Sequence, residues 1–284
     1  MIIADAIKLA IESLKKESIA NPVLDSRILL AYILNKEVDE IILNQNSIIL
    51  NEKQKEDFFA LVKLRLKKIP ISQIIGRREF YGNEFIVNKA VLDPRPDSEH
   101  LVSMVINKFQ IYFDKKLSIF EIGTGSGCLI ISILKHFINF HGLAVDIKSD
   151  ALDIAKINAN KHQIQNRITF LQSDLFLNIS KQHKFDIIIS NPPYIPTDEI
   201  KNLQDEVRLY EPLIALDGGI DGLDFYKKIA QDAKNYLQQD GNIFLEIGIN
   251  QHHDVIEIFK NNNFRFVEYI KDYNNIIRIL QFSL

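Results

Sequence analysis

The sequence of 284 residues contains one cysteine, no tryptophan and two methionines, and it lacks any long hydrophobic run. A lone Cys128 cannot form an intrachain disulfide, and a zinc cluster built on cysteines is not expected. No stretch approaches the roughly 18 uninterrupted apolar residues that a bilayer-spanning helix needs. The N-terminal segment carries Asp5 and Glu12 and lacks the basic and then apolar pattern of a secretory signal. We therefore expect a cytoplasmic protein with no membrane segment and no metal site.

Neither sign of charge dominates, since 34 basic residues accompany 37 acidic ones and the net charge is −3. This balance disfavours bulk binding to nucleic acid. Residues 1–90 hold 14 basic and 12 acidic side chains, whereas residues 91–284 hold 20 and 25. Six basic residues gather near the end of the first part: Lys63, Arg65, Lys67, Lys68, Arg77 and Arg78. We interpret this cluster first as a solvated helix face and alternatively as a docking patch for an acidic partner.

The N-terminal part has apolar residues at helical spacing. Three segments show this pattern: residues 2–17, 25–34 and 52–68. Asn21-Pro22 interrupts it after the first segment, and Pro70 marks the end of the last one. The spacing predicts a small helical bundle over residues 1–72.

A segment of different character follows the predicted bundle. Residues 78–88, REFYGNEFIVN, are rich in aromatic and β-branched side chains and are divided by Gly82-Asn83, which predicts a β-hairpin. The next segment, VLDPRPDSE, has two prolines that favour a fixed loop over a strand. We expect the hairpin and this loop to form a linker over residues 73–95.

From residue 117 onward, short apolar segments alternate with amphipathic ones. Strands are predicted at residues 117–122, 142–145, 168–172, 185–190 and 242–247, and helices at residues 127–137, 149–161, 221–237 and 250–261. Such alternation indicates an α/β fold with a Rossmann-like, mostly parallel sheet covered on both faces. The final strands, 265–270 and 276–282, are joined only by the turn DYNN, so this pair is expected to be antiparallel.

A glycine-rich turn joins the first strand of this sheet to a helix, and its residues are Glu121, Gly123, Thr124, Gly125, Ser126 and Gly127. Glycines allow a sharp turn and close approach of a ligand to the backbone, although tight turns often contain glycine for packing alone. The dinucleotide fingerprint would need a third glycine where Cys128 stands. The spacing instead resembles motif I of class I S-adenosylmethionine-dependent methyltransferases.

Two acids follow the next two predicted strands. Asp146 can accept hydrogen bonds from both ribose hydroxyls of a nucleoside, and we favour this role over capping the helix that begins near Ser149. Asp174, with Leu175 beside it, is expected at the adenine of the same cofactor, as the family pattern implies. Both acids should lie at the carboxyl edge of the sheet, where open α/β folds bind ligands.

The tetrapeptide Asn191-Pro192-Pro193-Tyr194 directly follows the strand FDIIIS. One interpretation is a rigid loop with a surface tyrosine. The other follows from chemistry: an asparagine oxygen and a proline carbonyl can accept both N–H bonds of an amide or exocyclic amine and aim its lone pair. A tyrosine face can stack on the planar group. The motif resembles the N-P-P-[YF] sequence of enzymes that methylate planar nitrogen, on adenine or on glutamine.

Eight segments together resemble the protein-(glutamine-N5) methyltransferases of peptide chain release factors, the PrmC/HemK family. They are NPVLDSRILL, GRREFYG, VLDPRPDSE, EIGTGSG, AVDI, QSDLF, SNPPYIP and VRLYEPLIALDGGIDGL, in that order from about residue 20 to the C-terminus. Two positions depart from the family pattern. Asp93 stands at a usually apolar position, and Ser98 replaces a threonine while keeping the hydroxyl.

The resemblance implies transfer of a methyl group from S-adenosyl-L-methionine to a glutamine of a release factor in translation termination, leaving S-adenosyl-L-homocysteine. It assigns the cofactor to the glycine turn, Asp146, Asp174, Leu175 and Asn191, and the glutamine amide to Asn191–Tyr194, with Asn191, Pro192 and Tyr194 as catalytic residues. Residues 96–284 would form the catalytic domain, and residues 1–72 would dock the release factor. We expect a monomer.

Two alternatives use the same residues. An adenine-N6 methyltransferase of DNA or RNA also carries this tetrapeptide, but the acidic balance of residues 91–284 disfavours a surface for phosphates. We therefore expect no stable complex with nucleic acid. A methyltransferase fold that only binds partners is the second alternative, which the intact catalytic positions disfavour.

Overall fold

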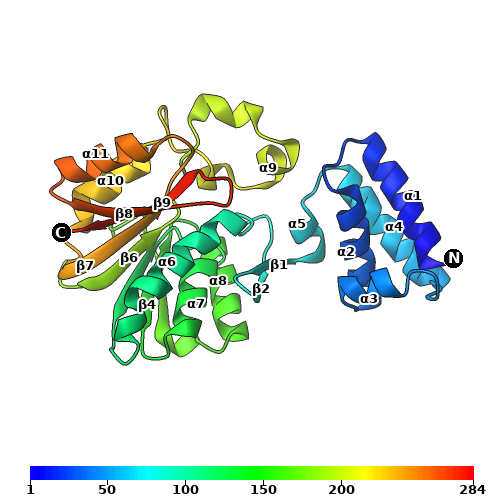
Figure 1. The fold of residues 1–284 in the computed structure, drawn as a ribbon, viewed down its shortest axis with the longest axis horizontal. Helices are drawn as coiled ribbons and strands as arrows, with labels where there is room; N and C mark the ends of the chain where they lie inside the picture. The colour runs from blue at the N-terminus through cyan, green and yellow to red at the C-terminus, as the bar shows by residue number, and fades with distance from the viewer. The chain divides into compact units, whose positions relative to one another are not determined.

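Two units make up the structure, which is a computed structural model describing residues 1–284 (Figure 1). One unit is helical and comprises Met1–Arg77 together with Gln204–Tyr210. The other contains the sheet and comprises Arg78–Leu203 and Glu211–Leu284. The division after Arg77 lies within the range for which the sequence predicts a linker.

The helical unit consists of α1 (Ile3–Lys16), α2 (Pro22–Leu34), α3 (Val38–Leu43), α4 (Glu52–Leu66), α5 (Ile71–Ile75) and α9 (Asp205–Tyr210). Apolar faces of α1–α5 enclose a core in which Leu14, Leu30 and Phe58 are fully buried. Pro22, which interrupts the helical pattern in the sequence, is the first residue of α2. Proline is tolerated there because a backbone N–H in the first turn has no partner within the helix, so its absence costs no hydrogen bond. α3 and α5 were not expected, since each is too short to show a helical period.

Helix α9 belongs to the helical unit although it comes from far along the chain. The Arg65 guanidinium, nearly inaccessible in α4, bonds the Asp25 carboxylate at 2.7 Å and the Glu206 carboxylate at 2.8 Å. Lys68 pairs with Asp205 at 2.5 Å, across 137 residues of sequence. These ion pairs hold α2, α4 and α9 together.

A two-stranded hairpin stands at the start of the sheet-containing unit, with strands β1 (Arg77–Phe80) and β2 (Asn83–Ile86); only its first residue, Arg77, is counted with the helical unit. Its turn residues are Tyr81 and Gly82, both with positive φ, as in the tight turns that match strand twist. The hairpin therefore turns one residue earlier than the Gly82-Asn83 signal predicts. Phe80 and Phe85 are fully buried in the core beside the main sheet.

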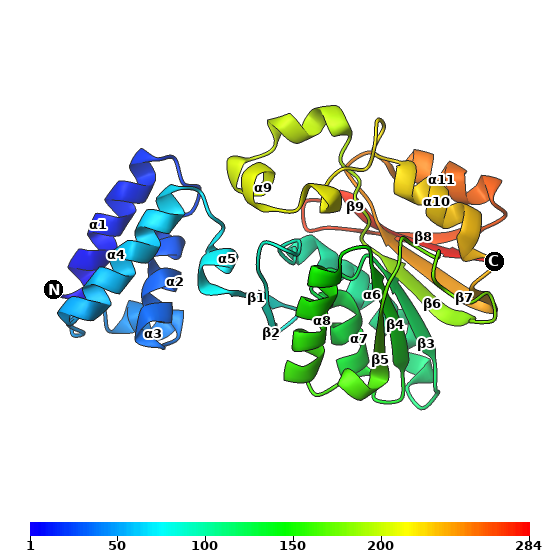
Figure 2. The ribbon, with the colours of Figure 1, turned by 180° about the vertical axis from the view of Figure 1, so that it is seen from behind.

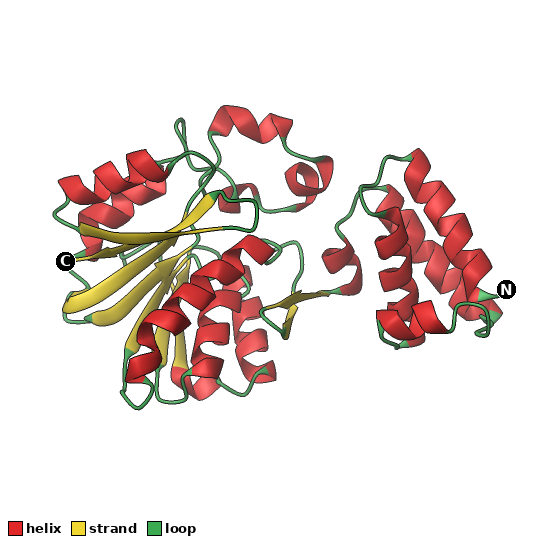
Figure 3. Cartoon of the chain, viewed as in Figure 1, coloured by secondary structure: helices red, strands yellow, loops and turns green.

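The main sheet has seven strands in the order β5-β4-β3-β6-β7-β9-β8. Its strands are β3 (Ser118–Ile122), β4 (His141–Asp146), β5 (Ile168–Gln172), β6 (Phe185–Ser190), β7 (Leu237–Glu246), β8 (Arg265–Lys271) and β9 (Ile277–Ser283), drawn in yellow in Figure 3. The first five strands pair in parallel, and β9 is antiparallel to both β7 and β8. The predicted mostly parallel sheet with an antiparallel C-terminal pair is confirmed.

Helices cover both faces of this sheet (Figures 1 and 2). The helices are α6 (Glu99–Phe109), α7 (Cys128–His136) and α8 (Ser149–Lys161) on one face, and α10 (Asp224–Ala233) and α11 (His252–Asn261) on the other. Successive strand residues alternate between two cores: Ile119 joins the α6–α8 side and Phe120 the α10–α11 side. Helix α6 was not among the sequence predictions, and β7 starts five residues before the predicted strand.

Short 3₁₀ helices complete the chain: η1 (Pro96–Ser98), η2 (Gln110–Tyr112), η3 (Gln165–Arg167), η4 (Thr197–Asn202) and η5 (Leu213–Ala215). None of the helices combines the length and apolar character required to cross a membrane.

Candidate active site

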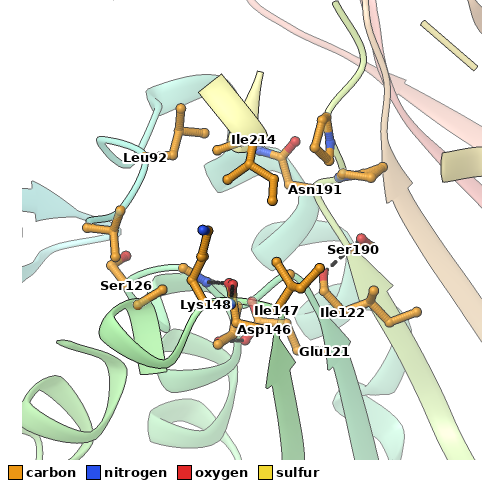
Figure 4. Close-up of a pocket in the computed structure, with 18 of the residues that line it drawn as sticks. Leu92, Glu121, Ile122, Ser126, Asp146, Ile147, Lys148, Ser190, Asn191 and Ile214 are labelled. Atoms are coloured by element: carbon orange, nitrogen blue, oxygen red, sulfur yellow. Dashed lines mark hydrogen bonds between the residues drawn. The ribbon is translucent and has the colours of Figure 1, made fainter. Parts of the chain in front are cut away.

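The carboxyl ends of β3 and β6 lie side by side where the strand order reverses. From β3 the chain builds outward to β4 and β5, and β6 then pairs with the opposite side of β3. Open α/β sheets bind ligands at such a switch point, because the connections leave it on opposite faces and open a crevice. A cavity of about 330 Å³ lies here, lined by the glycine turn after β3 and by Asn191–Pro193 of the tetrapeptide after β6 (Figure 4).

The glycine turn is held by the neighbouring strand. The amides of Gly123 and Thr124 both donate to the Val145 carbonyl at 2.9 Å. Gly123, Gly125 and Gly127 all have φ between +53° and +79°, where residues with a Cβ are strained. A Cβ at either of the first two would meet no protein atom within 4 Å, so the turn leaves that space to a ligand. The sequence pattern predicted this open turn from its glycine spacing.

Asp146 ends β4 beside the glycine turn, and its carboxylate lines the cavity. One oxygen accepts from the Gly125 amide at 2.9 Å and the other from the Lys148 amide at 2.9 Å. Burial raises the pKa of this group, and the backbone hydrogen bonds partly offset that shift. Helix α8 begins at Ser149 without a side-chain cap, so Asp146 braces the glycine turn and does not cap the helix.

Glu121 is almost completely buried at the end of β3 and lines the same cavity. The Thr124 hydroxyl donates to one of its carboxylate oxygens, whereas Oε1 has no partner in the chain. Burial raises its pKa to about 8, and the nearby charge of Asp146 contributes in the same direction. A buried oxygen without a partner costs free energy, and a donor on a ligand bound in the cavity would relieve this cost.

Asp174 and Leu175 line the cavity from the loop after β5. Leu175 has φ +49°, which is unusual for a branched residue and marks local strain. The Ser173 hydroxyl holds this conformation by donating to the Leu175 carbonyl at 3.0 Å.

The tetrapeptide presents Asn191 at the cavity, close to the end of β3. Its Nδ2 donates to the hydroxyl of Ser98 at 3.1 Å, which leaves Oδ1 available as an acceptor. Ser98 is buried at the end of η1 and also lines the cavity. A hydroxyl from the Pro-containing loop thus fixes the orientation of the asparagine amide.

Tyr194 takes a different position, because its ring packs against the core on the α10–α11 side. Its hydroxyl lies 3.4 Å from Glu246 Oε1, and burial raises its pKa. Its carbonyl accepts from the Gln251 side chain at 2.9 Å. A Cβ on Gly222 would lie only 2.4 Å from that carbonyl oxygen, so the DGGIDGL segment needs glycine to pack against the tetrapeptide.

Most of the predicted site residues line one cavity: Glu121, Gly123, Thr124, Gly125, Ser126, Asp146, Asp174, Leu175, Asn191, Pro192 and Pro193. Gly127 and Tyr194 do not line it. Gly127 lies against α8, where a Cβ would approach Ala155 Cβ at 3.3 Å.

Several other residues complete the cavity without having been predicted. Figure 4 shows Leu92 and Ile214 across it from Asp146 and Lys148. Leu92 belongs to the VLDPRPDSE segment and Ile214 to EPLIAL, so the only sequence signal was the family resemblance of those segments.

Comparisons with known proteins agree with this architecture. Residues 97–207 match the methyltransferase small domain, and residues 5–76 match the PrmC N-terminal domain. The hMettl16 catalytic domain, solved in complex with MAT2A 3'UTR hairpin 1, superposes with a TM-score of 0.57 over 89% of this chain and 90% of that chain. At 16% identity this similarity concerns the fold alone.

Sequence relatives are much closer. A bifunctional methyltransferase of Rickettsia felis is 39% identical over 99% of this chain, which spans 58% of that relative. The chain thus covers little more than half the length of the Rickettsia relatives. A release factor glutamine methyltransferase of Clostridium acetobutylicum is 39% identical over 99% of this chain and 98% of its own length. With this identity over two whole chains, and with both domain matches, the chain belongs to the release factor glutamine methyltransferase family.

Proposed function

We propose that the protein transfers a methyl group from S-adenosyl-L-methionine to the side-chain nitrogen N5 of a glutamine in a peptide chain release factor. The observation that carries the proposal is the oriented amide of Asn191 at the switch-point cavity. The names of the full-length relatives support the choice of substrate. We further propose that the helical unit docks the release factor, because residues 5–76 match the PrmC N-terminal domain.

The residues around the cavity fit this cofactor. Glu121 Oε1 offers a buried acceptor without a partner, and the open faces of Gly123 and Gly125 leave room for a ligand against the backbone. Asp146 would accept from the ribose hydroxyls, and Asp174 with Leu175 would border the adenine. When bound, the cofactor supplies an electrophilic methyl group on its sulfonium.

In the proposed reaction, this chain mainly positions the substrate amide. An amide nitrogen is a poor nucleophile because its lone pair is delocalised. The Asn191 oxygen and the Pro192 carbonyl would accept its two N–H bonds and hold the nitrogen toward the methyl group. As the nitrogen gains positive character, both acceptors bind it more strongly than in the ground state. Positioning of this kind can remove about 7–11 kcal/mol of barrier without a nucleophilic side chain.

Asn191→Ala tests this assignment. We expect the variant to lose at least about 100-fold in kcat, as for loss of an oriented catalytic hydrogen-bonding group. Its affinity for S-adenosyl-L-homocysteine, measured by calorimetry, should stay within a few-fold of the parent. Asp146→Ala is the matched control, because it should weaken cofactor binding instead.

Tritiated cofactor should be supplied with release factor and with duplex DNA in parallel reactions. Label on the release factor alone is the expected result. Label on DNA alone would identify an adenine methyltransferase, and normal release-factor methylation by Asn191→Ala would remove Asn191 from the mechanism.

A further inference from the structure

The backbone carbonyl of Tyr194, at the end of the tetrapeptide, is held by a side chain that does not line the cavity. We propose that Gln251 is a positioning residue, whose carboxamide holds this carbonyl and thereby keeps the acceptor oxygens of Asn191 and Pro192 in place for the substrate nitrogen. The inference rests on the proposed function, because it explains how the acceptors of that reaction are fixed.

The Gln251 carboxamide bonds backbone groups of three separate segments. Its Nε2 donates to the Tyr194 carbonyl at 2.9 Å and to the Gly222 carbonyl at 3.3 Å, and its Oε1 accepts from the Gly248 amide at 2.9 Å. These groups belong to the tetrapeptide, to the DGGIDGL segment and to the loop after β7. Gln251 is only 9% exposed, so water competes little for the three bonds.

Donor and acceptor chemistry fixes the orientation of this carboxamide. Its nitrogen carries two N–H donors, and its oxygen only accepts. If the group were turned over, its oxygen would face two carbonyl oxygens and its nitrogen would face the Gly248 N–H, so all three contacts would be repulsive. An apolar side chain or an ionised carboxylate could not hold the Tyr194 carbonyl in this way.

The position of Gln251 in the chain supports a role outside its own helix. Gln251 is the N-cap residue of α11, a position where serine, threonine, aspartate or asparagine usually accepts from the first turn, but its side chain makes no such bond. Glycines stand where the carboxamide meets the backbone. A Cβ on Gly222 would lie 2.6 Å from Gln251 Nε2, and a Cβ on Gly248 would lie 2.7 Å from Oε1. The two glycines therefore allow this close approach.

The two prolines of the tetrapeptide connect the held carbonyl to the acceptor oxygens. Proline has a restricted φ and no backbone N–H, so this segment is stiff but cannot anchor itself through amides of its own. It is anchored before the prolines, where Ser190 Oγ donates to the Ile122 carbonyl at 2.9 Å (Figure 4), and after them at Tyr194. Release of the second anchor would let Asn191 and Pro192 shift together.

The kinetic test is Gln251→Met, assayed with the full-length protein and release factor. Methionine has a similar size and makes none of the three hydrogen bonds. We expect kcat to fall by about 10- to 100-fold, as for a displacement of the reacting groups by up to about 1 Å. Affinity for S-adenosyl-L-homocysteine and KM for the release factor should stay within a few-fold of the parent. The kcat is referred to the concentration of cofactor-binding sites, so that loss of folded protein does not imitate the effect.

Two further variants separate positioning from packing. Gln251→Glu keeps an acceptor for the Gly248 amide but cannot donate to Tyr194, so it should lose at least as much kcat as Gln251→Met. Gln281→Glu is the matched control, because Gln281 is fully buried in β9 and its Nε2 donates to Asn242 Oδ1 at 2.7 Å. It should keep the parental kcat. Parental kcat in Gln251→Glu, or an equal loss in Gln281→Glu, would overturn the proposal.

A second readout does not need a substrate. The Ile195 amide, directly after Tyr194, donates to the Leu216 carbonyl at 3.0 Å, and its hydrogen exchange reports how firmly the end of the tetrapeptide is held. In Gln251→Met this exchange should accelerate by about 5- to 10-fold, as the loss of one hydrogen bond implies, and in Gln281→Glu it should stay parental. Unchanged exchange in Gln251→Met would overturn the positioning role. If the parent methylates no release factor but the exchange accelerates, the proposed function fails and the hold on the tetrapeptide stands.

Discussion

Three carboxylates lie at or beside the candidate site, and burial raises the pKa of each. Of the three, Asp146 accepts the most hydrogen bonds, because a backbone amide donates to each of its carboxylate oxygens. Glu121 and Glu246 each keep one oxygen without a partner in the chain. Their pKa values rise to about 8 and about 7. A buried carboxylate oxygen without a partner lowers the stability of the folded protein. A ligand that donates a hydrogen bond to such an oxygen would reduce this cost.

Glu121→Gln should therefore stabilise the protein without cofactor, and more so at high pH. Folding raises the pKa of Glu121 in the parent from 4.5 to about 8. The contribution of this group to the stability of the folded protein is therefore complete below pH 4.5 and is lost as the pH rises to 8. Each pKa unit corresponds to about 1.4 kcal/mol of unfolding free energy. The thermal unfolding midpoint of the variant should lie above that of the parent at pH 8.5 and close to it at pH 5.

The measurement is thermal unfolding of both proteins across this pH range. Glu268→Gln, which removes an exposed carboxylate from β8, is the matched control and should show no such trend. A difference between Glu121→Gln and the parent that is independent of pH would contradict the buried, partly unpaired state of this group.

At the scale of the element, the glycine turn shows two distinct reasons for the same residue type. Gly123 and Gly127 share nearly the same backbone strain, with φ +71° and +79°. A Cβ on Gly123 would have no atom within 4 Å, whereas a Cβ on Gly127 would lie 2.9 Å from Ile131 Cδ1 in α7 and 3.3 Å from Ala155 Cβ in α8. The space beside the first glycine is open, and we propose that the cofactor occupies it, whereas the second glycine lets α7 and α8 approach.

Alanine substitutions should separate these two roles. Each substitution should lower the free energy of unfolding by about 1–2 kcal/mol, because alanine is strained in the left-handed backbone conformation. Gly127→Ala should cost about 1–3 kcal/mol more, because Ile131 is fully buried and the core there would be overpacked. Gly123→Ala should instead weaken binding of S-adenosyl-L-homocysteine. Chemical denaturation and calorimetry on both variants measure the two effects, and equal losses of stability would contradict the difference in packing.

The main structural feature at the scale of the whole molecule is the return of the chain to the helical unit at α9. Arg65 connects Asp25 and Glu206, which are distant in sequence, and both ion pairs are short. Burial raises the pKa of Asp25, and the Arg65 charge and hydrogen bond oppose that rise. Only Arg65 of the basic cluster found in the sequence is buried; Lys63 and Lys67 are exposed, as expected for a solvated helix face.

Arg65→Met should destabilise the helical unit by about 3–5 kcal/mol, because it leaves a buried carboxylate without its cation. Hydrogen exchange of the α9 amides should accelerate. Because we propose that this unit docks the release factor, KM for the release factor should rise while cofactor affinity stays unchanged.

Lys63→Met is the matched control, since it removes a charge from an exposed site on the same helix. It should leave exchange and KM close to the parent. An equal rise of KM in both variants would assign docking to surface charge, and unchanged exchange in Arg65→Met would show that these ion pairs do not hold α9.

Much of the fold could be predicted from the sequence because local signals were strong. The strands β3, β5 and β6 and helix α8 lie at or within one residue of their predicted bounds, since apolar runs alternate with helical periods there. Helix α6 was missed because no element was predicted between the Pro-containing loop and residue 117, although the buried residues of α6 recur at helical spacing. The extra residues of β7 are largely exposed and polar, so they carried no strand pattern.

The sequence by itself determined the α/β alternation, the glycine turn, the two acids and the tetrapeptide, because each depends on residue type and short-range spacing. Only the tertiary structure decided which groups meet across distant segments. In the structure the Asn191 amide donates to the Ser98 hydroxyl, the Tyr194 ring packs against the core, and Arg65 forms an ion pair with Glu206 of α9. Such contacts join residues far apart in the chain, and their geometry is set by strand order and helix packing, which no local pattern records.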